Sequence, residues 1–94
     1  MGELRVLHLN LVRKFFDEIA KGSKREEYRD RTDYWKTRLE GREYDFIRFR
    51  NEYRPDVPEM DVEFKGVEKV VRGARPQYAI RLGKILTLKR WNAK

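Results

Sequence analysis

The sequence predicts an α+β domain in which two helices close a small curled sheet of five or six strands. Three observations support this class. Several segments alternate apolar and polar residues, as half-buried strands do. Both segments with helical spacing come early in the chain, so helices and strands are segregated. A length of 94 residues favours one domain, which we place over residues 1–94.

The first predicted elements are a strand over residues 4–10 and a helix over residues 11–21. Leu7 and Leu9 share one face of the strand. Asn10 is placed to cap the start of the helix. Within the helix, apolar residues recur every three or four positions, which predicts one buried stripe of Val12, Phe15, Phe16, Ile19 and Ala20.

The next predicted elements are an extended segment over residues 24–30 and a short helix over residues 32–40. Thr32 is a candidate N-cap for this helix. Trp35 and Leu39 are four residues apart and so lie on one helical face, where they can anchor the helix.

The rest of the chain predicts strands and turns. Strands are expected over residues 44–50, 60–65 and 77–90, the last as one long strand or two. Two prolines mark a loop at residues 51–59, and a turn is expected at residues 73–76. Gly83 interrupts the last strand beside Lys84, which indicates a bulge or a corner of the sheet.

The composition excludes several kinds of chemistry. The chain has no cysteine, so it has no disulfide, thiolate ligand or thiol nucleophile. His8 is the only histidine and Ser23 the only serine, so a zinc site is not expected and any Ser-His-Asp triad depends on these two residues. We expect no metal and no cofactor. No apolar run approaches membrane-spanning length and the start lacks a signal-peptide pattern, so we expect a soluble, cytoplasmic protein.

The charge is high and unevenly distributed. Charged residues make up 41% of the chain and the formal net charge is +7. Either an ion-paired surface, as in heat-adapted proteins, or a polyanion-binding surface accounts for this excess. Residues 72–94, which include Arg81 and Lys84, hold basic residues and no acidic one. They form either a solvated strand edge that prevents aggregation or a strip that faces phosphates.

Residues 22–29 carry the most informative pattern, Gly-Ser-Lys-Arg-Glu-Glu-Tyr-Arg. This G-x-K-x-x-E-x-R pattern resembles the signature of the ASCH domain, a small β-barrel related to the PUA domain of RNA-binding proteins. The order of elements extends the resemblance over nearly the whole chain. The resemblance implies a PUA-like curled barrel with a cleft between barrel and helices, and RNA or a nucleotide as the partner.

The resemblance also implies activities. Some family members deacylate an N-acetylated cytidine nucleoside with a lysine, a threonine and a glutamate, and others are reported as ribonucleases. Lys24 stands at the lysine position, and Glu27 stands where the deacylating branch has its threonine. The loop that often reads Asn-Gly-Tyr in the family reads Asn51-Glu52-Tyr53 here.

The chemistry of these side chains suits ligand binding. Arg29 offers a planar fork for phosphate or a base edge, and Lys24 offers a compact charge. Glu27 can hold either cation or accept a hydrogen bond, and aromatic rings can stack on unpaired bases. The candidate ligand-binding residues are Lys24, Glu27, Arg29, Tyr34, Trp35, Arg38, Asn51, Tyr53, Arg81 and Lys84. The alternative is an internal ion cluster that closes the sheet, with Trp35 in the core.

Three functions remain open from the sequence. The first is a module that binds RNA or a nucleotide. The second is a hydrolase acting on RNA or a nucleoside amide, with Lys24 as base and Glu27 orienting it. The third is a protein-interaction module. The shortage of hydroxyl groups and the single histidine favour the first.

Overall fold

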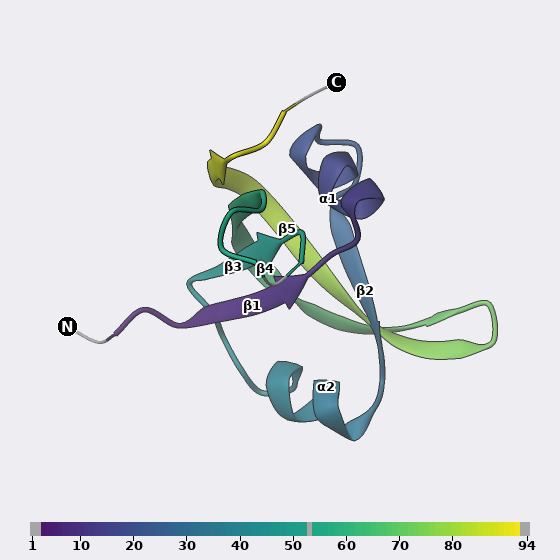
Figure 1. Ribbon diagram of the computed structural model, residues 1–94. Helices are drawn as coiled ribbons and strands as arrows, with labels where there is room; N and C mark the ends of the chain where they lie inside the picture. The colour runs from purple at the N-terminus through teal and green to yellow at the C-terminus, as the bar shows by residue number, and fades with distance from the viewer. Residues whose placement is uncertain (1–2, 53, 93–94) are drawn as a thin grey trace.

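The computed structural model describes residues 3–52 and 54–92, and it confirms the α+β class with five strands and two helices (Figure 1). The elements in chain order are β1 (Val6–Asn10), α1 (Arg13–Ala20), β2 (Glu26–Asp30), α2 (Asp33–Leu39), β3 (Phe46–Arg50), β4 (Glu59–Arg72) and β5 (Arg75–Lys89). No helix in the described part of the chain is long and apolar enough to span a bilayer.

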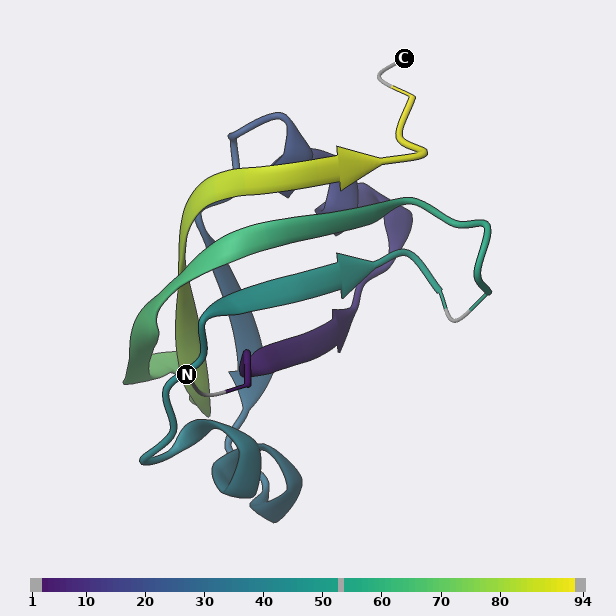
Figure 2. The same cartoon turned by 90° about the vertical axis from the view of Figure 1, so that its left-hand side faces the viewer.

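One curled sheet forms the body of the molecule, with strand order β1-β3-β4-β5-β2 (Figure 2). β1 and β3 are parallel, and the other neighbours are antiparallel. β1 and β2 are the two edges, and the sheet does not close into a barrel through main-chain pairing between them. The helices lie at opposite ends of the sheet (Figure 1).

The inner face of the sheet forms the core, because every strand turns alternate side chains toward it. β1 contributes Leu7 and Leu9 in the expected alternation. The fully buried side chains from the other elements are Phe16, Ile47, Phe49, Met60, Val62, Tyr78 and Ile80.

Helix α1 is shorter and less buried than expected. It buries only Phe16 and Ile19, while Val12 is 62% and Phe15 40% exposed, so the predicted five-residue stripe is wrong at its first two positions. The helix is buried along a narrow stripe through Phe16 and Ile19. The apolar residues Val12 and Phe15 lie outside that stripe. The expected cap is also wrong: Val12 occupies the N-cap position without a side-chain hydrogen bond, because Asn10 stays in the β1 ladder beside Arg50.

Helix α2 follows the prediction. Its first turn is capped by the Thr32 hydroxyl, which accepts a hydrogen bond from the backbone N–H of Trp35 at 3.3 Å. Leu39 is buried, and Trp35 is partly buried against the core.

The predicted bulge at Gly83 is present. Phe64 pairs with Leu82 and Val62 with Ile85, so β5 has an extra residue in this interval. A Cβ on Gly83 would lie 2.8 Å from the Glu63 Cβ, which explains why glycine fits here. The irregularity lies beside the start of β2, where the candidate site is found.

Candidate functional site

The turn between α1 and β2 positions the G-x-K-x-x-E-x-R residues. Gly22 adopts a φ of 84°, which ends the helix at little steric cost. The backbone N–H groups of Ser23 and Lys24 then both donate to the Glu18 carbonyl, at 3.0 and 3.1 Å. β2 begins only after this turn, so Lys24 comes from the turn and Glu27 from the strand.

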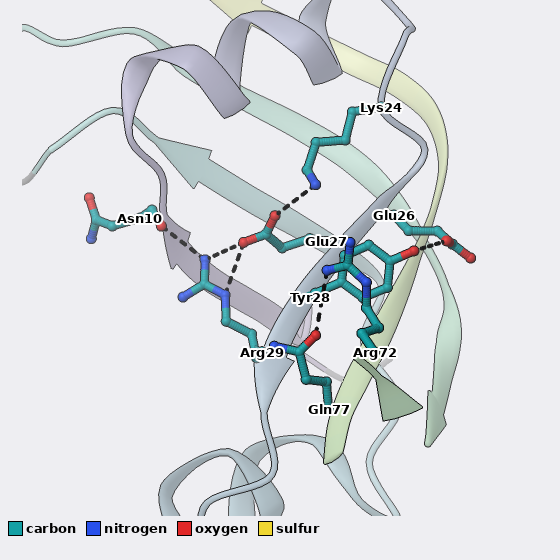
Figure 3. A network of polar contacts seen from close by, with 8 residues as sticks. All are labelled: Asn10, Lys24, Glu26, Glu27, Tyr28, Arg29, Arg72 and Gln77. Atoms are coloured by element: carbon teal, nitrogen blue, oxygen red, sulfur yellow. Dashed lines mark hydrogen bonds and ion pairs between the residues drawn. The ribbon is translucent and has the colours of Figure 1, made fainter. Parts of the chain in front are cut away.

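Lys24, Glu27 and Arg29 meet in one cluster on the inner side of β2 (Figure 3). The Arg29 guanidinium donates to Glu27 Oε2 through Nε at 3.0 Å and Nη2 at 2.8 Å. Lys24 Nζ lies 3.7 Å from Glu27 Oε1. Glu27 and Arg29 share a face because they are two residues apart in a strand. The structure therefore unites three residues that the sequence indicated.

This cluster also joins the two edges of the sheet. Arg29 Nη2 donates to the backbone carbonyl of Asn10 at 3.0 Å, which ties β2 to β1 (Figure 3). The Glu27 side chain is only 7% exposed, and each of its oxygens faces a cation. A buried carboxylate needs such partners. The interior of the cluster is thus an ion clamp, and Glu27 is poorly placed to act on a ligand.

The outer side of β2 carries a second network. The Tyr28 hydroxyl donates to Glu26, and this hydrogen bond raises the pKa of Tyr28. The Arg72 guanidinium lies 3.7 Å from the centroid of the Tyr28 ring. Arg81 donates to Glu26 at 2.8 Å and also pairs with Glu68, which raises the pKa of Arg81. Part of the predicted basic strip is therefore neutralised by carboxylates of neighbouring strands.

Two adjoining hollows open where β2 begins, with volumes of about 530 and 300 Å³. They share Lys24, Arg25 and Leu82, and we call the two together the basic groove. The backbone N–H of Leu82 donates to the Arg25 carbonyl at 3.1 Å, which fixes the turn against β5. The basic residues that line the groove are Lys24, Arg25, Lys65, Arg81 and Lys84, and the acidic one is Glu26.

The basic side chains of the groove differ in whether they form ion pairs within the protein. Lys65 lies 3.8 Å from Glu63, and Arg81 has two carboxylate partners. Arg25 and Lys84 are exposed and form no ion pair with any carboxylate in residues 3–52 or 54–92. Sequence reasoning found Lys24, Arg81 and Lys84 but missed Arg25 and Lys65. Arg25 follows Lys24 directly, and these two consecutive basic residues were the sequence feature that could have identified Arg25.

The candidate residues of α2 lie away from the basic groove. α2 is at the opposite end of the sheet from α1 (Figure 1). The Arg38 guanidinium stands 3.5 Å from the Tyr34 ring centroid, so these two side chains contact each other on α2. The Arg29 guanidinium lies 4.9 Å from the Trp35 ring centroid, and Trp35 packs against the core.

The loop residue Asn51 does not line the basic groove. Asn51 is 9% exposed, and its Nδ2 donates to the Leu11 carbonyl at 3.0 Å. It therefore supports the connection between β1 and α1, and it lines a separate hollow of about 710 Å³. Tyr53 lies outside the described residues.

The described residues contain no cluster of three or more side chains able to hold a metal ion. His8 is exposed on β1. The arrangement as a whole offers a binding surface for an anion, made of two cations without a carboxylate partner and three that are already paired.

Comparison of this chain with protein-family models, with curated proteins and with solved structures found no match.

Proposed function

We propose that the protein binds RNA or a nucleotide through phosphate groups held in the basic groove. One observation carries this proposal: five basic side chains and a single carboxylate line two adjoining hollows, and the side chains of two of those bases, Arg25 and Lys84, form no ion pair in the described structure. The backbone N–H of Lys84 donates to Glu63 at 2.9 Å, but its ammonium group lies beyond ion-pair distance of that carboxylate. Phosphate neutralised by such side chains releases counterions, which drives nucleic-acid binding.

The two cations without a carboxylate partner supply different contacts. The Arg25 guanidinium is a planar fork that matches two phosphate oxygens, and the Lys84 ammonium is a compact charge with freely rotating donors. Both side chains are exposed. Because neither must first leave an ion pair, each can bind a phosphate without the cost of stranding a carboxylate.

The same proposal includes kinship with the ASCH domain and a PUA-like architecture. Two observations support it. The G-x-K-x-x-E-x-R residues lie at the junction of a helix and a strand, beside the basic groove. The sheet is curled, and Arg29 links its two edges through Asn10, as expected of a barrel closed by side chains rather than by main-chain pairing.

The hydrolase alternative has weaker support. A base that acts on a ligand must reach it. Glu27 is 7% exposed and already holds Arg29 by two hydrogen bonds, and Lys24 lies 3.7 Å from the same carboxylate. These contacts agree with the orienting role that this alternative gives Glu27, but they occupy Lys24, its proposed base, with a carboxylate partner. No feature of the described surface singles out a protein partner.

The test measures binding of a fluorescent short RNA as salt is raised. The double variant Arg25→Gln/Lys84→Gln is compared with the charge-matched Lys36→Gln/Arg42→Gln, whose two cations lie on α2 and in the loop after it. The wild type should lose affinity steeply between about 50 and 200 mM salt. The groove variant should bind more weakly and lower the slope of log K against log salt by about 0.7 for each lost contact.

The control variant should keep the wild-type slope. Equal losses in the two variants would mean that only net charge matters and that the groove is not a site. No binding by the wild type at low salt would overturn the proposal altogether.

A further inference from the structure

Phe15 is an aromatic side chain left at the surface of α1. Its helix buries Phe16 and Ile19 completely or nearly so, while Phe15 remains 40% exposed. A single exposed apolar residue is ordinary in a folded protein. What distinguishes Phe15 is its position beside the basic groove, and the inference rests on that position.

The Phe15 ring lies beside two residues that line the groove. Lys24 Nζ lies 5.0 Å from the ring centroid, and Lys24 lines both hollows. Ile19, four residues further along α1, lines the smaller hollow. Residues four apart in a helix are neighbours on one face. Phe15 therefore neighbours two residues of the smaller hollow, which Arg25 and Lys84 also line.

The aromatic ring that lines the groove, Tyr28, is already covered. Tyr28 has the Arg72 guanidinium 3.7 Å from its centroid and its hydroxyl bonded to Glu26. Phe15 has the Lys24 ammonium at 5.0 Å as its one cation–ring contact in the described residues. It thus keeps apolar ring surface available to a flat partner.

We propose that Phe15 is a stacking platform for an unpaired nucleobase, so that the groove selects single-stranded over duplex nucleic acid. This inference rests on the proposed function. Bases stack on exposed aromatic rings in a sequence-tolerant way, whereas the bases of a duplex are stacked on each other and do not reach a protein ring. The groove would hold phosphates of the strand while the neighbouring base covers Phe15.

The test compares wild type, Phe15→Leu and Phe15→Trp on two probes, a single-stranded RNA and a duplex of the same sequence. Leucine removes the ring but keeps an apolar, helix-compatible side chain. Tyr34→Leu, which removes an exposed aromatic at the other end of the sheet, is the matched control. Phe15→Leu should weaken single-strand binding about 5- to 150-fold and leave duplex binding unchanged. Phe15→Trp should preserve single-strand binding.

A second measurement on the wild type does not depend on the variants folding. Ultraviolet crosslinking to uridine-containing RNA, followed by mass spectrometry, should place an adduct on Phe15 and not on the buried Phe16. Equal wild-type affinity for both probes, unchanged binding by Phe15→Leu, or an adduct confined to other residues would overturn the stacking inference and leave the proposed function standing. Failure of the wild type to bind either probe at low salt would overturn both.

Discussion

Basic residues lie on both sides of the turn before β2, but those on one side are paired with a buried carboxylate and those on the other side are not. On the inner side, Lys24 and Arg29 converge on Glu27, whose side chain is 7% exposed. On the outer side, Arg25 and Lys84 face the hollows without a carboxylate partner in the described residues. A cation whose partner lies inside the protein stabilises the fold, and one without such a partner is available to a ligand.

Strand geometry decides the direction of the β2 side chains, whereas Lys24 and Arg25 come from the turn before the strand. Side chains of a strand alternate between faces, so Glu27 and Arg29 point inward while Glu26 and Tyr28 point outward (Figure 3). On the inner face Arg29 contacts the Asn10 carbonyl of β1, and on the outer face Glu26 pairs with Arg81 of β5. The difference therefore depends on which surface each side chain meets, and residue type alone does not reveal it.

The largest expected effect comes from removing the inner carboxylate. Glu27→Gln leaves Lys24 and Arg29 together without a counter-charge. Breaking a buried ion pair by removing one partner costs about 3–5 kcal/mol. Both cations keep some contact with solvent, at 18% and 19% side-chain exposure, so we expect a loss near 3 kcal/mol in the free energy of unfolding. Urea denaturation measures it.

The control for this prediction is Glu26→Gln on the outer side of the same strand. Glu26 is 30% exposed at its side chain, and its pair with Arg81 lies at the surface. An exposed pair contributes about 0–1 kcal/mol, so the loss should be at most that size. Equal destabilisation by the two variants would remove the distinction between the two sides.

A smaller effect should appear at high pH, where another internal polar contact titrates. Burial and the hydrogen bond that its hydroxyl donates to Glu40 raise the pKa of Tyr78 from 10.0 to about 12. A raised pKa means that folding favours the protonated phenol. The stability from this contact is thus complete below pH 10 and is lost as pH rises toward 12.

Tyr78→Phe isolates this contribution, because the other tyrosines and the lysines titrate alike in both proteins. At pH 8 the wild type should be more stable by about 1 kcal/mol, the net value of a typical hydrogen bond. That advantage should shrink between about pH 10 and 12 in thermal melts. A difference that stays constant over this range would show that the Tyr78 phenol ionises as it does in the unfolded chain.

The smallest stability effect is expected for Lys24→Met, which keeps most of the side chain and removes the ammonium group. Glu27 retains both Arg29 hydrogen bonds, and the Lys24 contact is long at 3.7 Å. The loss in unfolding free energy should be about 1 kcal/mol or less. RNA affinity, measured on the same sample, should fall by a larger factor because Lys24 lines both hollows. A loss of binding fully explained by unfolding would mean that Lys24 only stabilises the ion cluster with Glu27 and Arg29 and does not contact the RNA.

Much of the fold could be predicted because local patterns carry it. The alternation around Leu7 and Leu9 and the Thr32 cap are decided by neighbouring residues, and both are present. The bulge at Gly83 is also present, although the close approach of Glu63 that favours glycine there is a contact between strands. The prediction was wrong for Phe15, because periodicity shows which residues share a face but not how much of that face the sheet covers.

The sequence by itself determined the class of the domain, the order of its elements and the basic character of its surface. Tertiary structure alone decided which charges are used internally. Arg81 is neutralised by Glu26 from β2 and Glu68 from β4, whereas Lys84, three residues later, has no such partner among the described residues. Ion pairs between strands depend on register and curl, which join residues far apart in the chain, so no local pattern can distinguish a paired cation from an unpaired one.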